Sequence, residues 1–481
     1  MNHFIRCSFF FLALPTVIFC IFWCNWWIAL PLVLLIIKTC LSVSSGANLG
    51  GNVGFVLRRR DVFLLGIAFS LIVLSQYLVG YTGVVSQHSD FASRNAMYGT
   101  LCSEVWPVKA ENGVPMVYYI GGWLPSALIS KLAGFGCRNH LFMYQNVFIL
   151  FAAYLLLCFR LRKVTLTPIL AAAILGSVSE IFGTSFVRFF GACGVQDWYF
   201  SPAPLWQSPW KQLSCTVNHG AYSFLAGALC CMRYKNGVTY AFIGALLLVV
   251  SPISTIALSP LILYKLMPVC RDIKELVSGN ICFMTTALVV MVMFVFFTQV
   301  STQGARVNFL CAKMLHYGVA DNVRILVSYI GTCGIILLLF VRGKMRSAEF
   351  WIVFISFALL PLCFYGYNYN EIMLKGPAPL WIFFCLYFAQ VMGKKTQMIP
   401  RMTAAVLIAL FCLRGIKAVP RCVEQFGDYE HNICDPYGSD YFSAKATEAK
   451  RVTKGYRVFP MPDELSMKPE ECRPILSYIL K

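Results

Sequence analysis

The sequence has few charged residues and very few acidic ones. Asp, Glu, Lys and Arg together make up 13% of the 481 residues, roughly half the share found in an ordinary soluble domain, whereas hydrophobic residues make up 58%. Only 21 residues are acidic, against 40 that are basic. A chain this apolar is excluded from the soluble globular class, so we predict an integral membrane protein.

The sequence also lacks the spacings that indicate a disulfide or metal framework. It has 21 cysteines, but no Cys-x-x-Cys pair and no Cys/His spacing typical of a zinc site. Most cysteines lie inside apolar runs, where Cys behaves as a small hydrophobic residue. Internal repeats and low-complexity segments are absent as well. We therefore expect neither a disulfide scaffold nor a cysteine-ligated metal.

The formal net charge of +19 raises the question of a nucleic-acid partner. The Lys and Arg residues stand in short clusters at the ends of apolar runs, not along one exposed face. Such clusters are typical of membrane topology signals and of contacts to anionic lipids. We therefore expect membrane lipids as partners, and no nucleic acid.

Apolar runs long enough to cross about 30 Å of hydrocarbon predict an all-α polytopic fold with about thirteen transmembrane helices. The first run resembles a signal peptide, but the second follows it without a small-residue cleavage site, so we expect the first to be retained. The predicted spans lie near 4–24, 26–43, 62–85, 141–160, 165–187, 221–235, 238–250, 254–267, 281–300, 323–341, 349–366, 376–392 and 402–416.

The basic clusters predict the topology. They all fall on one side of the membrane if the N-terminus is cytoplasmic, which places the C-terminus outside. This solution requires the apolar segment Val114–Ala133, which contains Pro115 and Pro125, to lie on the outer surface as a helix. Residues 1–416 then form the membrane domain, and 417–481 form a small extracytoplasmic segment. The outer loops are 86–140, 188–220, 301–322 and 366–375.

The first outer loop carries a polar stretch, Ser86–Val108, with three candidate residues. Asp90 lies close to the membrane boundary and suits a general base or metal ligand, or else caps a helix that starts at Phe91. Arg94 follows four residues later; it can pair with Asp90 or offer a bidentate fork to a phosphate. Glu104 is a second candidate acid, although a plain solvated carboxylate is the simpler interpretation.

Two later outer loops add further candidates. Residues 188–220 are rich in aromatics, which are more typical of a membrane-interface belt than of a sugar platform, and they include Arg188 and His219. His219 can titrate near neutral pH or donate to a phosphate, but it can also be an ordinary interfacial residue. In the loop after 366, Glu371 and Lys375 are four apart, which suits a simple ion pair or a site facing Asp90.

Several motifs around these residues carry a family resemblance. They are Asp90 in the first large outer loop, Trp-Pro at 106–107, VYYIGGWLPSALISKLAG at 117–134, VNHGAYSFLAGAL at 217–229, SPIS and LSPLIL within 251–263, and YGYNYNEIMLKGPAP at 365–379. Together they span most of residues 60–392. In this arrangement the chain resembles the polytopic glycosyltransferases of the C superfamily, and more closely a group of predicted bacterial membrane proteins in it.

The resemblance implies an enzyme that uses a polyprenyl-phosphate-linked sugar donor at the outer leaflet of the bacterial cytoplasmic membrane. The acidic residue of the first outer loop is the catalytic or metal-associated residue in that superfamily, and this role falls on Asp90. The family often has two adjacent acids, whereas Asp90 stands alone, so a divalent metal stays open as a cofactor. Where related sequences have Asn-Asp followed by Arg, this chain has Asn370-Glu371 and Lys375, which makes Glu371 a second catalytic candidate.

This hypothesis assigns the cations to the leaving group. Arg94, Arg188 and Lys375 would offset charge on the departing phosphate while Asp90 removes the proton of the acceptor. Three other classes stay open: a lipid or polysaccharide transporter or flippase, a surface-polysaccharide polymerase or ligase, and an inactive family member that serves in assembly. The sequence shows no inverted repeat, which disfavours the transporter.

Overall fold

The structure is a computed structural model. It describes residues 2–43, 58–82, 85, 91–109, 116–134, 139–180, 219–234, 236–269, 281–298, 307–309, 319–340, 345, 347–365, 372, 375–392, 398, 400–408 and 480. Most of these residues are helical, as predicted for an all-α membrane protein. The predicted C-terminal segment 417–481 lies outside the described residues, apart from Leu480.

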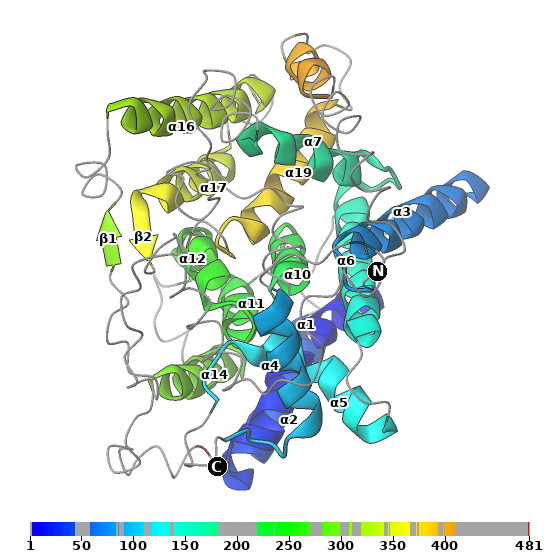
Figure 1. Ribbon diagram of the computed structural model, residues 1–481, viewed down its shortest axis with the longest axis vertical. Coiled ribbons are helices and arrows are strands. Elements are labelled where there is room, and N and C mark those ends of the chain that lie inside the picture. The colour runs from blue at the N-terminus through cyan, green and yellow to red at the C-terminus, as the bar shows by residue number, and fades with distance from the viewer. Residues whose placement is uncertain are drawn as a thin grey trace.

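The apolar helices pack together as a bundle (Figure 1). Over the described ranges they are α1 (Asn2–Trp23), α2 (Trp26–Val43), α3 (Arg59–Leu78), α4 (Phe91–Ser103), α5 (Leu124–Ala133), α6 (Asn139–Leu161), α7 (Thr167–Glu180), α10 (Gly220–Cys230), α11 (Val238–Leu248), α12 (Pro252–Leu266), α14 (Ile281–Phe297), α16 (Val319–Phe340), α17 (Ala348–Leu359) and α19 (Ala378–Met392).

Most of these helices coincide with a predicted span. Within the described residues, four of them, α1, α2, α3 and α6, are long and apolar enough to cross a membrane. Shorter apolar helices of 10–17 residues include α10, α11, α12, α14 and α19. The chain is therefore a helical membrane protein, while the count of thirteen crossings stays a prediction.

The end of one predicted span is wrong. The run 349–366 was expected to be helical throughout, but α17 ends at Leu359 and a 3-10 turn, Leu360–Leu362, leads into the strand β2 (Cys363–Tyr365). Pro361 has no N–H for the helical hydrogen bonds, so the helix cannot continue regularly. The strand pairs antiparallel with β1 (Val307–Phe309), with Asn308 opposite Phe364.

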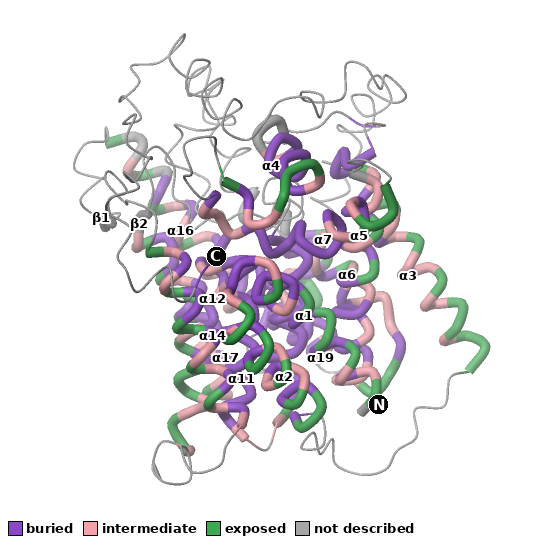
Figure 2. The backbone as a smooth tube through the Cα atoms, turned by 90° about the horizontal axis from the view of Figure 1, so that it is seen from below, coloured by how far each residue is buried: buried purple, intermediate pink, exposed green. Residues whose placement is uncertain are grey.

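The segment expected to lie on the outer surface is shorter than predicted. A 3-10 turn over Ile120–Gly122 precedes α5, which ends at Gly134 in a left-handed conformation with φ 65°. Its ten residues cover about 15 Å, half the thickness of the hydrocarbon layer, so α5 by itself is too short to span that layer. Both α4 and α5 lie at the opposite end of the molecule from the N-terminus (Figure 2).

The helices differ in how deeply they are buried. Every residue of α10 is buried, and its Gly227 lies so close to α19 that a Cβ there would be 2.5 Å from the Pro379 carbonyl oxygen. In contrast, α3 packs along one side, with Ala68 and Ile72 against Val147 of α6, and extends away from the bundle (Figure 1). The centre of the fold is therefore α10, and polar groups gather at both of its ends.

Candidate functional site

A three-residue turn, Val249–Ser251, joins α11 to α12 and holds two distant segments in place. The carbonyl oxygen of Val249 accepts a hydrogen bond from the backbone N–H of Gly121 at 3.1 Å. The carbonyl oxygen of the next residue, Val250, lies 2.7 Å from Nδ1 of His219. Because consecutive carbonyls point to different segments, one turn fixes both the chain around Gly121 and the histidine that begins α10.

Gly121 is required by this close approach. A Cβ at this position would lie 2.7 Å from the Val249 carbonyl oxygen, which is shorter than real Cβ contacts. Any other residue would push the turn and the segment apart. The two tyrosines of the segment, Tyr118 and Tyr119, are therefore positioned by the glycine that follows them.

A chain of serine hydroxyls holds a third segment against the same turn. Ser251 caps α12, and its hydroxyl donates to the hydroxyl of Ser254 at 2.8 Å. Ser223 of α10 donates to the same oxygen at 2.9 Å, and Ser254 in turn donates to the carbonyl oxygen of Lys375 at 2.8 Å. All three serines are buried. The backbone of Lys375 is thus tied to both α10 and α12.

These segments bring two cations together on a pair of tyrosines. Nη1 of Arg94, from α4, donates to the hydroxyl of Tyr118, and Nζ of Lys375 donates to the hydroxyl of Tyr119. The two hydroxyls are themselves hydrogen-bonded at 2.6 Å. Nζ of Lys375 also lies 4.6 Å from the centre of the Tyr119 ring, and Lys375 is only 2% exposed. With His219, these residues form what we call the tyrosine-linked cluster.

His219 lies against the tyrosines as a buried, neutral ring. Its ring centre is 4.2 Å from that of Tyr119, and the residue is 1% exposed. A carbonyl oxygen can only accept, so the contact with Val250 places the ring hydrogen on Nδ1 and leaves a lone pair on Nε2. Nε2 is buried and has no hydrogen-bond partner within the described part of the chain.

Electrostatics favours this neutral form. Burial lowers the pKa of His219 well below its ordinary value, the charges of Lys375 and Arg94 lower it further, and the bond to Val250 opposes them. Burial of the ring, and after it the two nearby positive charges, therefore oppose the sequence-based expectation that His219 titrates near neutral pH. The cluster combines two cations, which suit an anion, with one neutral acceptor nitrogen.

The candidate residues from the sequence have different positions in the structure. Arg94, His219 and Lys375 come together in the tyrosine-linked cluster, although they are far apart in the sequence. Glu104 is exposed; its carboxylate contacts Ser103 at 3.5 Å, and within the described residues no contact joins it to the cluster. Three candidates, Asp90, Arg188 and Glu371, lie outside the described residues.

Three observations bear on the remaining sequence predictions. The helix that an Asp90 cap requires is present, because α4 begins at Phe91. Across the described residues, no group of three or more His, Cys, Asp or Glu side chains could hold a metal ion. Most of the described cysteines lie in apolar helices.

Sequence reasoning missed the two tyrosines and the serine chain. The signal for Tyr118 and Tyr119 was their place directly before Gly121-Gly122, a pair that indicates a close backbone approach. The signal for Ser251 was its position before Pro252, which is the pattern of a helix cap followed by a first-turn proline. Neither pattern indicates which distant segment will be the partner.

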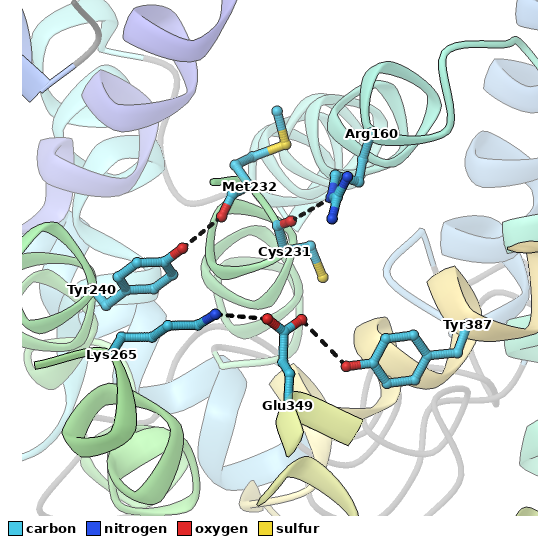
Figure 3. Close-up of polar contacts among 7 residues, drawn as sticks. All are labelled: Arg160, Cys231, Met232, Tyr240, Lys265, Glu349 and Tyr387. Atoms are coloured by element: carbon cyan, nitrogen blue, oxygen red, sulfur yellow. Dashed lines mark hydrogen bonds and ion pairs between the residues drawn. The ribbon is translucent and has the colours of Figure 1, made fainter. Parts of the chain in front are cut away.

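A second polar cluster lies at the other end of α10 (Figure 3). Lys265, in the last turn of α12, forms an ion pair of 2.6 Å with Glu349, in the first turn of α17. The hydroxyl of Tyr387 lies 3.4 Å from the same carboxylate. Nearby, Nε of Arg160 donates to the carbonyl oxygen of Cys231 at 2.9 Å. We call this group the Glu349 cluster.

Comparison of the chain with protein-family models, curated proteins and solved structures gives no match. The fold and the site define the class: a helical membrane protein with a cationic cluster held on two tyrosines. Any narrower assignment depends on the chemistry of that cluster.

Proposed function

We propose that the protein is a membrane glycosyltransferase that uses a polyprenyl-phosphate-linked sugar donor at the outer leaflet of a bacterial cytoplasmic membrane. One observation supports the proposal: Arg94 and Lys375 reach two hydrogen-bonded tyrosine hydroxyls at one end of an apolar helix bundle. A phosphate on a lipid tail needs cations at this depth and apolar surface beside them. The sequence resemblance to the C superfamily leads to the same class.

The chemistry needs charge on the leaving group to be offset. When an acceptor hydroxyl attacks C1 of the sugar, the bond from C1 to the phosphate oxygen breaks and its electron pair leaves with the phosphate. Arg94 and Lys375 would stabilise this developing negative charge. Removal of one such charge-stabilising donor typically costs a factor of about 100 or more in rate.

Asp90 is proposed as the general base that takes the proton of the acceptor hydroxyl, and Glu371 as a second carboxylate near the reacting groups. Each precedes a cation of the cluster by four residues in the sequence: Asp90 precedes Arg94, and Glu371 precedes Lys375. The proposal also includes the thirteen-span topology with a cytoplasmic N-terminus. It places the tyrosine-linked cluster on the outer side, with α4 and α5.

Binding of the lipid carrier is the first test. The purified protein in detergent should bind polyprenyl phosphate and should bind polyprenol, which lacks the phosphate, much more weakly. Arg94→Gln should weaken the binding of polyprenyl phosphate only. Equal binding of the phosphate and the alcohol would contradict the proposal.

Sugar transfer is the second test. With a polyprenyl-phosphate-linked sugar and membrane lipid extract as acceptor, Asp90→Asn should abolish transfer while carrier binding persists. Transfer by Asp90→Asn at the wild-type rate would contradict the assignment of the base. Movement of the glycolipid across a vesicle membrane without any transfer would instead identify a flippase.

A further inference from the structure

The tyrosine-linked cluster contains a group that phosphate binding does not use. Nε2 of His219 carries a lone pair, because Nδ1 holds the ring hydrogen against the Val250 carbonyl. His219 is 1% exposed, so its unpartnered acceptor carries the cost of its lost hydration, which a native structure usually offsets with a partner. Within the described residues the chain supplies none, so a ligand is the natural donor.

The chemistry of Nε2 decides what kind of donor fits. A phosphate oxygen at neutral pH is an acceptor, so it does not suit a bare ring nitrogen. A hydroxyl group is both small and a donor, and a sugar carries several of them. Because His219 lies against Tyr119, whose hydroxyl binds Lys375, a hydroxyl on Nε2 would belong to the same ligand as an anion held by the cations.

The same surroundings make His219 unsuitable as a general base. Lys375 and Arg94 both oppose a positive charge on the ring. A ring that resists protonation can still accept a hydrogen bond, and its orientation is fixed by the Val250 carbonyl and the Tyr119 ring. His219 is therefore suited to recognition rather than to proton transfer.

We infer that Nε2 of His219 accepts a hydrogen bond from one hydroxyl of the donor sugar, so that His219 determines which sugar phosphates the protein uses. The inference rests on the proposed function, since it assumes a sugar on the phosphate that Arg94 and Lys375 hold. It adds that the cations recognise the phosphate, while the histidine distinguishes the sugar from the bare carrier.

The experiment compares lipid probes on the purified full-length protein. The probes are polyprenyl phosphate, the same lipid carrying glucose, galactose or mannose, and deoxy versions of the hexose that binds best. For the wild-type protein, at least one glycosylated lipid should bind about tenfold more tightly than the bare carrier, and one deoxy version should lose about that factor. If no sugar improves binding and no deoxy version weakens it, the inference is overturned.

Two variants then locate the effect. His219→Phe keeps a ring without an acceptor, and should lower the preference for the hydroxyl about tenfold, measured against the binding of the bare carrier by the same variant. His219→Gln, which retains an acceptor oxygen, should recover part of the preference. His140→Gln, at a half-buried histidine of α6, is the matched control and should change neither.

The outcomes separate this inference from the proposed function. If the wild-type protein does not bind bare polyprenyl phosphate, the proposed function fails. If it binds the bare carrier but His219→Phe discriminates the deoxy version as strongly as the wild-type protein, only the role of His219 fails. Because the wild-type comparison needs no variant, the inference can be tested even if both substitutions prevent folding.

Discussion

The two ends of α10 carry polar clusters of opposite character. At its N-terminal end Arg94 and Lys375 donate to the hydroxyls of two tyrosines. At its C-terminal end Lys265 forms an ion pair with the carboxylate of Glu349. Eleven residues, about 16 Å of helix, separate the two.

The difference indicates what each cluster can do. Lys265 and Glu349 are 23% and 30% exposed, and their pairing joins the end of α12 to the start of α17. Such a pair fixes helix ends and leaves little field for a ligand. In the tyrosine-linked cluster burial, and after it the charges of Lys375 and Arg94, lower the pKa of His219. We therefore expect substitutions in the tyrosine-linked cluster to affect binding, and substitutions in the Glu349 cluster to affect stability.

The largest expected effect separates the two lysines. Lys375→Met should lower sugar transfer about 100-fold, because it removes a charge that stabilises the leaving phosphate. Lys265→Met is the matched control and should leave transfer unchanged. Equal losses of transfer in both variants would remove the distinction between the clusters.

The next effect concerns the turn that positions the tyrosines. Gly121→Ala should lower the free energy of unfolding by about 1–3 kcal/mol, because the new Cβ meets the Val249 carbonyl oxygen at 2.7 Å. Equilibrium unfolding in mixed micelles would measure this change in the free energy of unfolding. The control is Gly66→Ala in α3, where no atom lies within 4 Å and the change should stabilise by about 0.5–1 kcal/mol. Destabilisation by both variants would mean that the close approach is not the cause.

The third prediction concerns pH and the buried histidine. The pKa of His219 is lowered in the folded protein, so below an ordinary value of about 6.5 the unfolded chain binds a proton that the folded protein does not. The charged groups that act on it are Lys375 and Arg94. Stability should therefore fall as the pH drops through that value, by up to about 1.4 kcal/mol per pH unit.

Thermal unfolding in detergent between about pH 7.5 and 5.5 measures this slope. Because other groups also titrate in that range, the comparison is with His219→Gln, whose stability should fall less steeply as the pH is lowered. Identical slopes in the two proteins would show that His219 is not held neutral by the cluster.

The smallest effect tests the Glu349 cluster as a pair. Glu349→Gln and Lys265→Met should each destabilise the protein, and the double variant should be less destabilised than the sum, with a coupling of about 1 kcal/mol. This coupling energy is small because both side chains are partly exposed to solvent. A coupling near zero would reduce the pair to surface decoration, whereas a loss of carrier binding would place it in the functional site.

Much of the fold was predictable from apolar runs. Apart from α4 and α5, which lie in the predicted outer loop 86–140, the described helices fall on predicted spans, because burial in hydrocarbon selects long apolar segments whatever their partners are. The strand at Cys363–Tyr365 is an exception, because a short apolar run does not distinguish a strand from a helix.

The candidate site was predictable as residue types, but not as an arrangement. Arg94, His219 and Lys375 were identified by charge and position at span ends. The protonation state of His219 was not, because it depends on Val250 and on two cations that are distant in the sequence.

By itself, then, the sequence determined that this is a helical membrane protein and which polar residues interrupt its apolar runs, since both follow from composition and spacing along the chain. Tertiary structure alone decided that Val249–Ser251 is the turn on which three segments converge, and that Lys265 meets a carboxylate while Lys375 meets a tyrosine. The physical reason is that helix packing, not sequence distance, sets which charges share a buried space.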